Sequence, residues 1–396
     1  MKSLFAGLAL AVLIVAPGWA GEKSVKIGVL TDLTSFASRS SGQGSVDAAK
    51  IAASDFGGTV IGKPIEVISA DMQSKPDIAV EIARRWYETE NVDLIVDVPN
   101  SAAALAIRGL AADSHRVFIP TIAASSAITA KGCSPNTIHW VINSAAIVRA
   151  FVNALSADGA KTWFLLMPDY AIGKAFAADA QRYIDAIGGK VIETVYFPVN
   201  NGDFAQFVLR AQNSGADVIA TGGIGTDLSN LIKQANEFGV LPSSKQRLAA
   251  FVITVSEIHG TGLPIMQGVW AAQDFYWDQN DRTRAFAKKF FAVENRMPDF
   301  THAGNYSAVT AYLGAIKAVD SDDAAKVLAQ LKQGTVSRFG EPSTIRADGR
   351  AVFDVGLYRV KSPAESHDAW DVLKPVGTIA SDKIFDPIDK DCAAGK

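Results

Sequence analysis

Residues 92–121 read VDLIVDVPNSAAALAIRGLAADSHRVFIPT, and this stretch indicates how the whole chain is built. VDLIVDV (92–98) and VFIPT (117–121) are apolar runs of strand length, and residues 102–114 between them favour a helix. Apolar strands without polar alternation are typical of parallel strands that helices cover on both faces. The stretch therefore predicts a strand–helix–strand unit of a parallel sheet.

The same alternation of strand and helix extends outward from this unit in both directions. The first series has expected strands at 25–30, 65–71, 92–98 and 117–121. A second series has expected strands at 162–168, 190–197, 217–223 and 248–253, with helices at 145–157, 172–187, 204–213 and 227–238. Two series of this kind predict an α/β fold with two lobes, each a doubly wound parallel sheet.

The last third of the chain has a different pattern. After an extended run at 268–277, helices are expected at 281–295, 303–319 and 322–332, and strands at 351–360 and 372–379. We expect this helical block, without a sheet of its own, to pack on the first lobe and the final strands to join the second.

That arrangement sets the expected domain organisation. It requires three crossover segments, near 140–143, 271–275 and 346–352, which would form a hinge. The first lobe would comprise residues 21–141 and 272–346, and the second 142–271 and 347–396. A ligand would bind in the crevice at the carboxyl ends of the strands.

Residues 1–20, MKSLFAGLALAVLIVAPGWA, carry the pattern of a targeting segment. A basic start, a short apolar core and a small residue at the end are typical of a cleaved secretory signal peptide. The apolar run is shorter than the roughly 20 residues that a membrane-spanning helix needs. We therefore expect an exported, soluble mature chain that begins at Gly21; a buried N-terminal helix is the alternative.

Composition agrees with an exported globular protein. The formal net charge of −3 provides no basic field for nucleic acid. The chain has two cysteines, Cys133 and Cys392. Because an even number of cysteines in an oxidising compartment favours disulfide bonding, we expect one bond between them, with two buried thiols as the alternative.

Motifs of known enzyme classes are absent from the sequence. There is no GxSxG, Walker A or HExxH motif, and the five histidines are scattered without metal-ligand spacing. The stretch Gly222-Gly223-Ile224-Gly225 follows a strand but lacks the spacing of a dinucleotide-binding loop. We expect no catalysis, no metal and no cofactor; an exported hydrolase remains an alternative.

Several segments resemble one family in the correct order along the mature chain. They are VKIGVLTDLTSFAS (25–38), IPTIAASSAIT (119–129), PDYAIGKAFAADAQRYIDAIGGKVI (168–192), NGDFAQFVLRAQNSGADVIATGG (201–223) and HAGNYSAVTAYLGAI (302–316). The chain resembles the type I periplasmic binding proteins of ABC importers, in the leucine/isoleucine/valine-binding branch. FYWDQNDRTRAFAKKF (275–290) and the paired cysteines resemble a subgroup that takes aromatic or other organic carboxylates.

The resemblance implies a ligand pocket formed by loops of both lobes. Asn100 and Ser101 stand where the family presents hydroxyl and backbone N–H donors to a ligand carboxylate, and Tyr170 matches an aromatic residue that closes over the ligand. The expected ligand-binding residues are Phe36, Arg39, Asn100, Ser101, Ile122, Ala123, Ala124, Tyr170, Gly223, Ile224, Thr254, Phe275 and His302.

The chemistry of these residues suits an anion, although four of them have a structural alternative. Helix N-termini and Ser or Asn side chains supply the donors that a carboxylate needs. Asn100 could instead only cap the following helix, and His302 could be a structural histidine. Arg39 could be a solvated loop residue, and Tyr170 could be loop surface.

One departure from the family bears on the ligand. Amino-acid-binding members place an acidic residue after the strand that corresponds to 248–253, where this chain has Thr254-Val255-Ser256 and reaches Glu257 only later. A buried ammonium without a carboxylate partner costs several kcal/mol. We therefore expect a carboxylate ligand without an amine, aromatic or aliphatic; amino acids are the alternative if Glu257 reaches the pocket.

The resemblance implies a function. The chain would be a monomeric periplasmic protein that captures its ligand by closure of the lobes and delivers it to an ABC permease in the inner membrane. A sensor that reports ligand occupancy to a membrane receptor is an alternative with the same sequence features.

Overall fold

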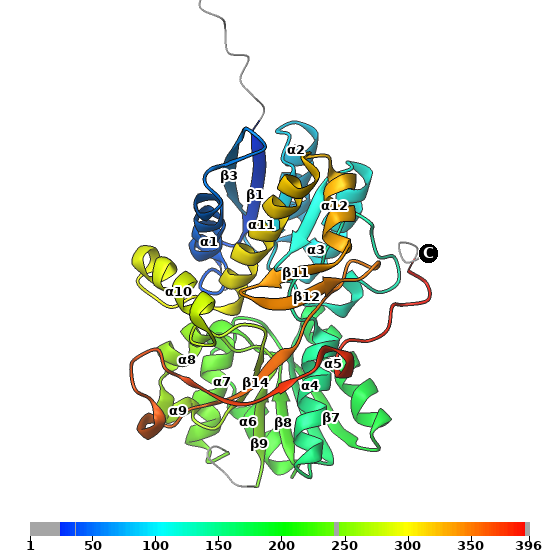
Figure 1. Ribbon diagram of the computed structural model, residues 1–396. Coiled ribbons are helices and arrows are strands. Elements are labelled where there is room, and N and C mark those ends of the chain that lie inside the picture. The colour runs from blue at the N-terminus through cyan, green and yellow to red at the C-terminus, as the bar shows by residue number, and fades with distance from the viewer. Residues whose placement is uncertain (1–23, 36, 241–244, 393–396) are drawn as a thin grey trace, which may run out of the picture.

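The computed structural model describes residues 24–35, 37–240 and 245–392, which form two lobes, one above the other in Figure 1. The predicted signal peptide (1–20) and Phe36 lie outside these residues. Within the described residues, no helix has both the length and the apolar content needed to cross a membrane.

The first lobe is built on a five-stranded sheet of order β2-β3-β1-β4-β5. β1, β3, β4 and β5 are parallel, whereas β2 pairs antiparallel with β3. The strands are β1 (Val25–Thr31), β2 (Thr59–Val60), β3 (Lys63–Asp71), β4 (Leu94–Asp97) and β5 (Val117–Pro120); the helices are α1 (Gly42–Asp55), α2 (Pro76–Glu88) and α3 (Ser101–Asp113).

The second lobe is built on a seven-stranded sheet of order β15-β14-β10-β9-β8-β6-β7. Its parallel strands are β6 (Thr162–Pro168), β7 (Lys190–Phe197), β8 (Val218–Thr221), β9 (Arg247–Ala250) and β10 (Trp270–Gln273). Its helices are α4 (Ser144–Ala157), α5 (Ala171–Ala186), α6 (Ala205–Asn213), α7 (Gly225–Glu237), α8 (Val255–Thr261) and α9 (Leu263–Met266). The predicted fold class is confirmed.

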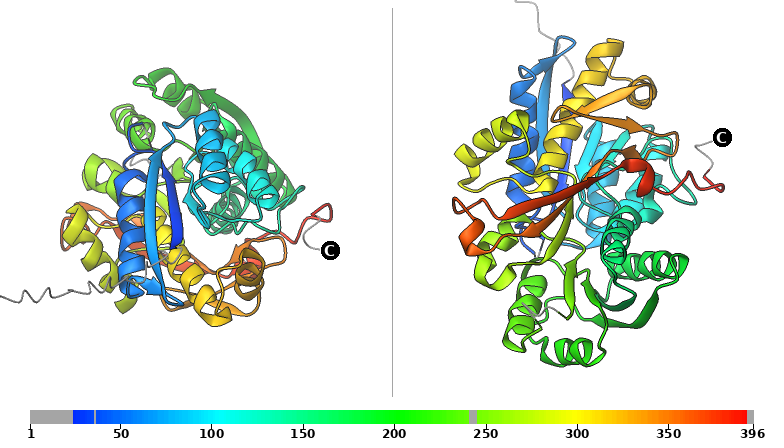
Figure 2. Two further views of the ribbon diagram at one scale, coloured as in Figure 1. Left: turned by 90° about the horizontal axis from the view of Figure 1, so that it is seen from above. Right: turned by 60° about the horizontal axis from the view of Figure 1, so that its bottom comes forward.

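The C-terminal third returns to both lobes. α11 (Phe300–Val319) and α10 (Asp281–Glu294) pack on α1, and α12 (Ala324–Lys332) packs on α11. As predicted, the final strands β14 (Val355–Val360) and β15 (Leu373–Ile379) join the second sheet. Their pairing is antiparallel. Figure 2 shows this C-terminal segment, orange to red, running across the molecule between the lobes.

The expectation that the helical block has no sheet of its own is wrong. β11 (Thr335–Arg338), β12 (Glu341–Ile345) and β13 (Ala351–Val352) form a three-stranded antiparallel sheet beside α11 and α12. Phe339 and Gly340, with φ of 52° and 93°, form the two-residue turn that joins β11 to β12. These strands are short and largely polar, so the search for apolar runs missed them.

Two buried arginines tie together the segments that run between the lobes. Nη1 of Arg338 donates to the Trp140 carbonyl at 2.8 Å and Nη2 to the Asp274 carboxylate at 2.8 Å. Arg350 donates to the carbonyls of Val141 and Ala351. The chain passes between the sheets before α4, after β10 and before β14. The residue bounds of the two lobes stay a prediction.

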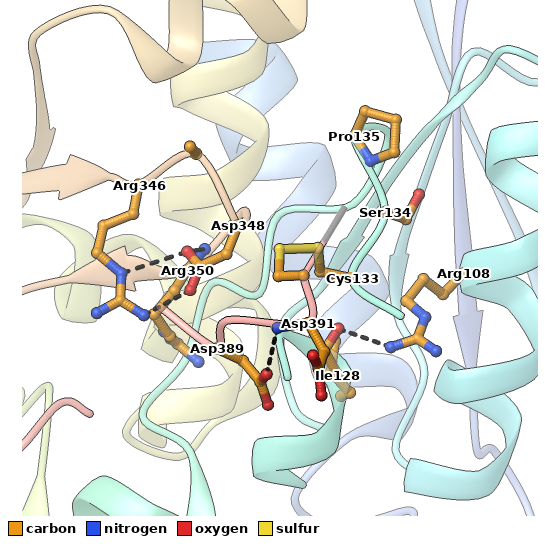
Figure 3. Close-up of a disulfide and its surroundings, with 12 residues drawn as sticks. Arg108, Ile128, Cys133, Ser134, Pro135, Arg346, Asp348, Arg350, Asp389 and Asp391 are labelled. Atoms are coloured by element: carbon orange, nitrogen blue, oxygen red, sulfur yellow. Dashed lines mark hydrogen bonds and ion pairs between the residues drawn. A yellow bond between two sulfur atoms is a disulfide. The ribbon is translucent and has the colours of Figure 1, made fainter. Parts of the chain in front are cut away.

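The predicted disulfide is present. Cys133 and Cys392 are bonded, with their Cα atoms 5.3 Å apart. Cys133 follows the short helix η1 (Ser126–Ile128), and Figure 3 shows the bond beside Arg108, whose guanidinium donates to the Ile128 carbonyl at 3.0 Å. The bond therefore fastens the C-terminal tail, which leaves β15 of the second sheet, to a loop that follows β5 of the first.

Candidate ligand site

A cavity lies between the lobes at the carboxyl ends of the strands. Its volume is about 60 Å³, whereas one water molecule needs about 10–15 Å³, so it suits a small molecule. Its walls are mostly apolar. The lining residues are Ala37, Ser40, Pro99, Ser101, Ile122, Ala123, Ala124, Val141, Ile142, Ile147, Tyr170, Ile172, Phe176, Gly222, Ile224, Val252, Thr254, Glu257, Phe300 and Thr301.

The wall of the first lobe begins where the backbone turns sharply at the end of β4. Asp97 and Val98 both have left-handed backbone angles, with φ of 78° and 58°. This conformation is a true outlier for a β-branched residue such as Val98. It is held by a hydrogen bond of 2.9 Å from the Val98 N–H to the Leu30 carbonyl. The turn directs Pro99 and Ser101 into the cavity wall.

A buried carboxylate network lies at the same strand end. The Asp97 carboxylate accepts hydrogen bonds from the Ser41 hydroxyl at 2.6 Å, the Ser45 hydroxyl at 3.1 Å and the Asn305 amide at 2.9 Å. Burial raises the pKa of Asp97, while these donors lower it. The network joins α1, β4 and α11, and so fixes the strand end that carries Ser101.

The N-terminus of α3 lies where the sequence predicts donors for a ligand carboxylate. Asn100 caps this helix, because its side-chain oxygen accepts from the N–H groups of Ala102 at 2.9 Å and Ala103 at 3.1 Å. Ser101, the first residue of α3, lines the cavity. A helix N-terminus attracts anions through its free N–H groups and its dipole. Asn100 is outside the cavity lining, so its observed role is that of the cap.

The second lobe contributes the ends of β6, β8 and β9. Tyr170 and Ile224 are the N-cap residues of α5 and α7, and both line the cavity, as do Ile122, Ala123 and Ala124 from the opposite lobe. Burial, together with the nearby Asp227, raises the pKa of Tyr170, so its phenol stays neutral.

Glu257 reaches the cavity wall. Its carboxyl group accepts hydrogen bonds from the N–H of Thr254 at 2.7 Å, the hydroxyl of Thr254 at 3.0 Å and the N–H of Gly225. Its pKa is raised to about 7, mainly by burial and in part by the Asp299 carboxylate, against the lowering effect of the hydrogen bonds. The reason for expecting an amine-free ligand, that Glu257 comes too late in the chain, therefore no longer holds.

Besides Asn100, four of the expected residues that the structure describes lie outside the cavity lining. Phe275 packs with Phe286 and Phe339 in a separate aromatic cluster. His302 is fully buried, its Nδ1 accepts the N–H of Asp299 at 3.0 Å, and burial lowers its pKa well below the usual range. The remaining two are Arg39, whose guanidinium lies beside Gly260, and Gly223, whose N–H donates to the Thr221 hydroxyl at 3.1 Å.

Other lining residues had no signal in the sequence. Ile142 belongs to the segment between the lobes, Phe176 to the second turn of α5, and Thr301 to the first turn of α11. Helical periodicity shows that such residues are buried, but not that they face a cavity. Within the part of the chain that the structure describes, no group of three or more His, Cys, Asp or Glu side chains could hold a metal ion.

Comparison with known proteins agrees with this geometry. A family described as "Periplasmic binding protein" matches residues 24–366, so the chain belongs to that family of ABC-transporter solute-binding proteins, as predicted. A periplasmic binding protein of Burkholderia mallei is 39% identical, with a TM-score of 0.89, over 94% of this chain and 99% of that one. A "branched chain amino acid ABC transporter periplasmic ligand-binding protein" of Burkholderia xenovorans LB400 is 40% identical, with a TM-score of 0.86, over 94% and 100%. The "Leu/Ile/Val-binding protein homolog 1" of Brucella abortus is 24% identical, over 84% of this chain and 88% of that one.

Proposed function

We propose that this chain captures a small organic carboxylate in the periplasm and delivers it to an ABC permease of the inner membrane. The observation that carries the proposal is a small cavity with the N-terminus of α3 on one wall and Glu257 on the other. The ligand carboxylate would bind at the hydroxyl and backbone N–H of Ser101, because the N–H groups of Ala102 and Ala103 already donate to Asn100. The apolar side chains around it would bury the ligand body, which is the usual source of affinity in such pockets.

We infer that an amino acid with an apolar side chain is the ligand. Glu257 is the only formally charged residue in the described cavity lining. An ionised Glu257 would repel an anionic ligand, whereas the ammonium of an amino acid would pair with it. The name of the relative from Burkholderia xenovorans LB400 supports the same ligand class.

An amine-free aromatic or aliphatic acid is the second candidate. With a pKa of about 7, Glu257 is partly neutral at physiological pH, and its oxygens already accept hydrogen bonds from Thr254 and Gly225. A neutral carboxyl would tolerate an anionic ligand. The apolar walls would hold an aromatic ring as readily as an aliphatic side chain.

Titration calorimetry with matched ligand pairs tests both candidates. Leucine is compared with 4-methylpentanoate, valine with 3-methylbutanoate and phenylalanine with 3-phenylpropanoate; each second member lacks only the amine. Benzoate is added as an aromatic acid. We expect binding of at least one amino acid and at least tenfold weaker binding of its amine-free partner.

The variant Glu257→Gln serves as the control. It keeps the size of the side chain and an oxygen acceptor but removes the charge, so it should abolish the preference for the amine. Tighter binding of the amine-free member in every pair would overturn the amino-acid assignment in favour of the second candidate. If none of these compounds binds, the carboxylate proposal itself fails.

A further inference from the structure

Asp299 joins the two lobes beside the cavity without lining it. Its side chain is fully buried, and it immediately precedes α11, which packs on α1 of the first lobe. Its Oδ1 atom accepts the backbone N–H of Ser256 at 3.0 Å. Ser256 belongs to α8, which follows β9 of the second lobe. The hydrogen bond therefore connects the two lobes beside the cavity.

The bond satisfies the N-terminus of α8. The first N–H groups of a helix have no partner within the helix. Thr254, the N-cap residue, accepts one of them with its hydroxyl, from the N–H of Glu257 at 3.1 Å. The N–H of Ser256 is accepted by Asp299 of the other lobe. One of the two capping hydrogen bonds of α8 thus lies within the second lobe, and the other comes from the first. Separation of the lobes would break the bond between Ser256 and Asp299.

The same helix turn forms part of the ligand site. Thr254 and Glu257 of the α8 cap line the cavity, as do Phe300 and Thr301, which follow Asp299. Asp299 is held ready on the first lobe, because its N–H donates to His302 Nδ1 at 3.0 Å and Arg296 Nη1 lies 3.9 Å from its Oδ2.

We propose that Asp299 is a positioning residue that caps α8 across the lobe gap and thereby stabilises the closed state that holds the ligand. The proposal rests on ligand capture as the function of the cavity. Asp299 would affect affinity without contacting the ligand. The reason is that the N-terminal turn of α8, with Thr254 and Glu257, is fully hydrogen-bonded only when the two lobes are in contact.

The charge of Asp299 has a separate effect on Glu257. The groups around this pair are Arg296 and Arg39, which lower the pKa of Asp299, and the buried His302. Asp299 in turn raises the pKa of Glu257. Replacement by asparagine removes this charge but keeps an oxygen that can accept the Ser256 N–H, so the charge and the cap can be separated.

The test uses Asp299→Ala, Asp299→Asn and the control Asp323→Ala. Asp323 caps α12 within the first lobe, since its Oδ1 accepts the N–H of Lys326 at 3.0 Å. Amide hydrogen exchange over residues 255–261 is measured without ligand and with leucine or benzoate. Affinity for the same two probes is measured by calorimetry, and thermal unfolding verifies that each variant is folded.

We expect Asp299→Ala to speed exchange in α8 and to weaken binding roughly ten- to a hundredfold, the loss expected for a hydrogen bond to a charged group. Asp299→Asn should retain slow exchange and bind within a few-fold of the wild type. Asp323→Ala should change neither quantity.

The proposal is overturned if Asp299→Ala exchanges and binds like the wild type, or if Asp299→Asn loses as much as Asp299→Ala. Should neither leucine nor benzoate bind the wild type, the exchange measurement without ligand still decides whether Asp299 caps α8. The two outcomes can then be told apart. Absence of binding contradicts the ligand assignment, whereas unchanged exchange in Asp299→Ala contradicts the hydrogen bond from Asp299 to the N-terminus of α8.

Discussion

Three buried carboxyl groups, those of Asp97, Glu257 and Asp299, surround the cavity. Burial raises the pKa of each, and each is compensated by hydrogen-bond donors. Their surroundings differ. The donors to Asp97 all belong to the first lobe, whereas Asp299 accepts a hydrogen bond from Ser256 of the second lobe. Glu257 forms part of the cavity wall. Glu257 is therefore the carboxyl whose protonation a ligand would change.

Ligand binding should depend on pH through Glu257, with a sign that reports the ligand class. The ammonium of an amino acid stabilises the ionised carboxylate and lowers its pKa from about 7. Protons are then released on binding, and affinity rises from pH 6 to pH 8. An amine-free anion raises the pKa further, so protons are taken up and affinity falls over the same range. Calorimetry in two buffers of different ionisation enthalpy measures the proton count.

Glu257→Gln should remove this pH dependence for either ligand class, because the amide does not titrate. If wild-type affinity and proton count are the same at pH 6 and pH 8, Glu257 does not interact with the ligand charge.

At the scale of single elements, the N-terminus of α3 is both capped by its own side chain and part of the cavity wall. The Asn100 side-chain oxygen accepts hydrogen bonds from the N–H groups of Ala102 and Ala103, while Ser101 lines the cavity. Neighbouring residues thus have different observed roles, because the turn into the helix directs one side chain back onto the backbone and the other into the gap.

Asn100→Ala should lower the free energy of unfolding by about 0.5–2 kcal/mol, the usual effect of losing an N-cap. Urea unfolding measures the change. Asn100→Asp keeps an acceptor oxygen at the cap and should retain most of the stability. A loss of ligand affinity in Asn100→Ala without any loss of stability would show that this side chain acts on the ligand rather than on the helix.

At the scale of the whole molecule, the disulfide fastens the C-terminal tail across the region between the lobes. The bonded cysteines are 259 positions apart in the sequence. The tail between β15 and Cys392 also forms an ion pair, because Asp386 lies 2.7 Å from Arg182 of α5. The tail thus adds a covalent connection to the three segments that pass between the sheets.

Cys392→Ser should lower the free energy of unfolding by about 2–4 kcal/mol, because the crosslink restricts the unfolded chain. Urea unfolding of the oxidised wild type and the variant measures this difference. Cys133→Ser combined with Cys392→Ser should be no less stable than Cys392→Ser alone, since both lack the same bond. Equal stability of the oxidised wild type and Cys392→Ser would contradict a stabilising role.

Much of the fold could be predicted from the order of strands and helices. Runs such as 92–98 and 117–121 are apolar because both faces of their sheet are covered, and that property is local. The regular alternation gave two parallel sheets, and the cysteine count gave the disulfide. The hairpin of β11 and β12 was missed because its strands are short and partly exposed.

The predicted residues that follow strand ends line the cavity, whereas lining residues that depend on packing between distant elements were missed. Ser101, Ala124 and Ile224 follow strands directly, so the parallel sheets bring them to the cavity. Phe275 and His302 were expected there but lie in the core, and Glu257 and Thr301 line the cavity instead.

The sequence by itself determined which segments are buried and in what order they form the sheets, because periodicity and composition are local properties. Only the tertiary structure decided which side chains face the cavity, because that depends on how helices far apart in the chain pack across the gap between the lobes.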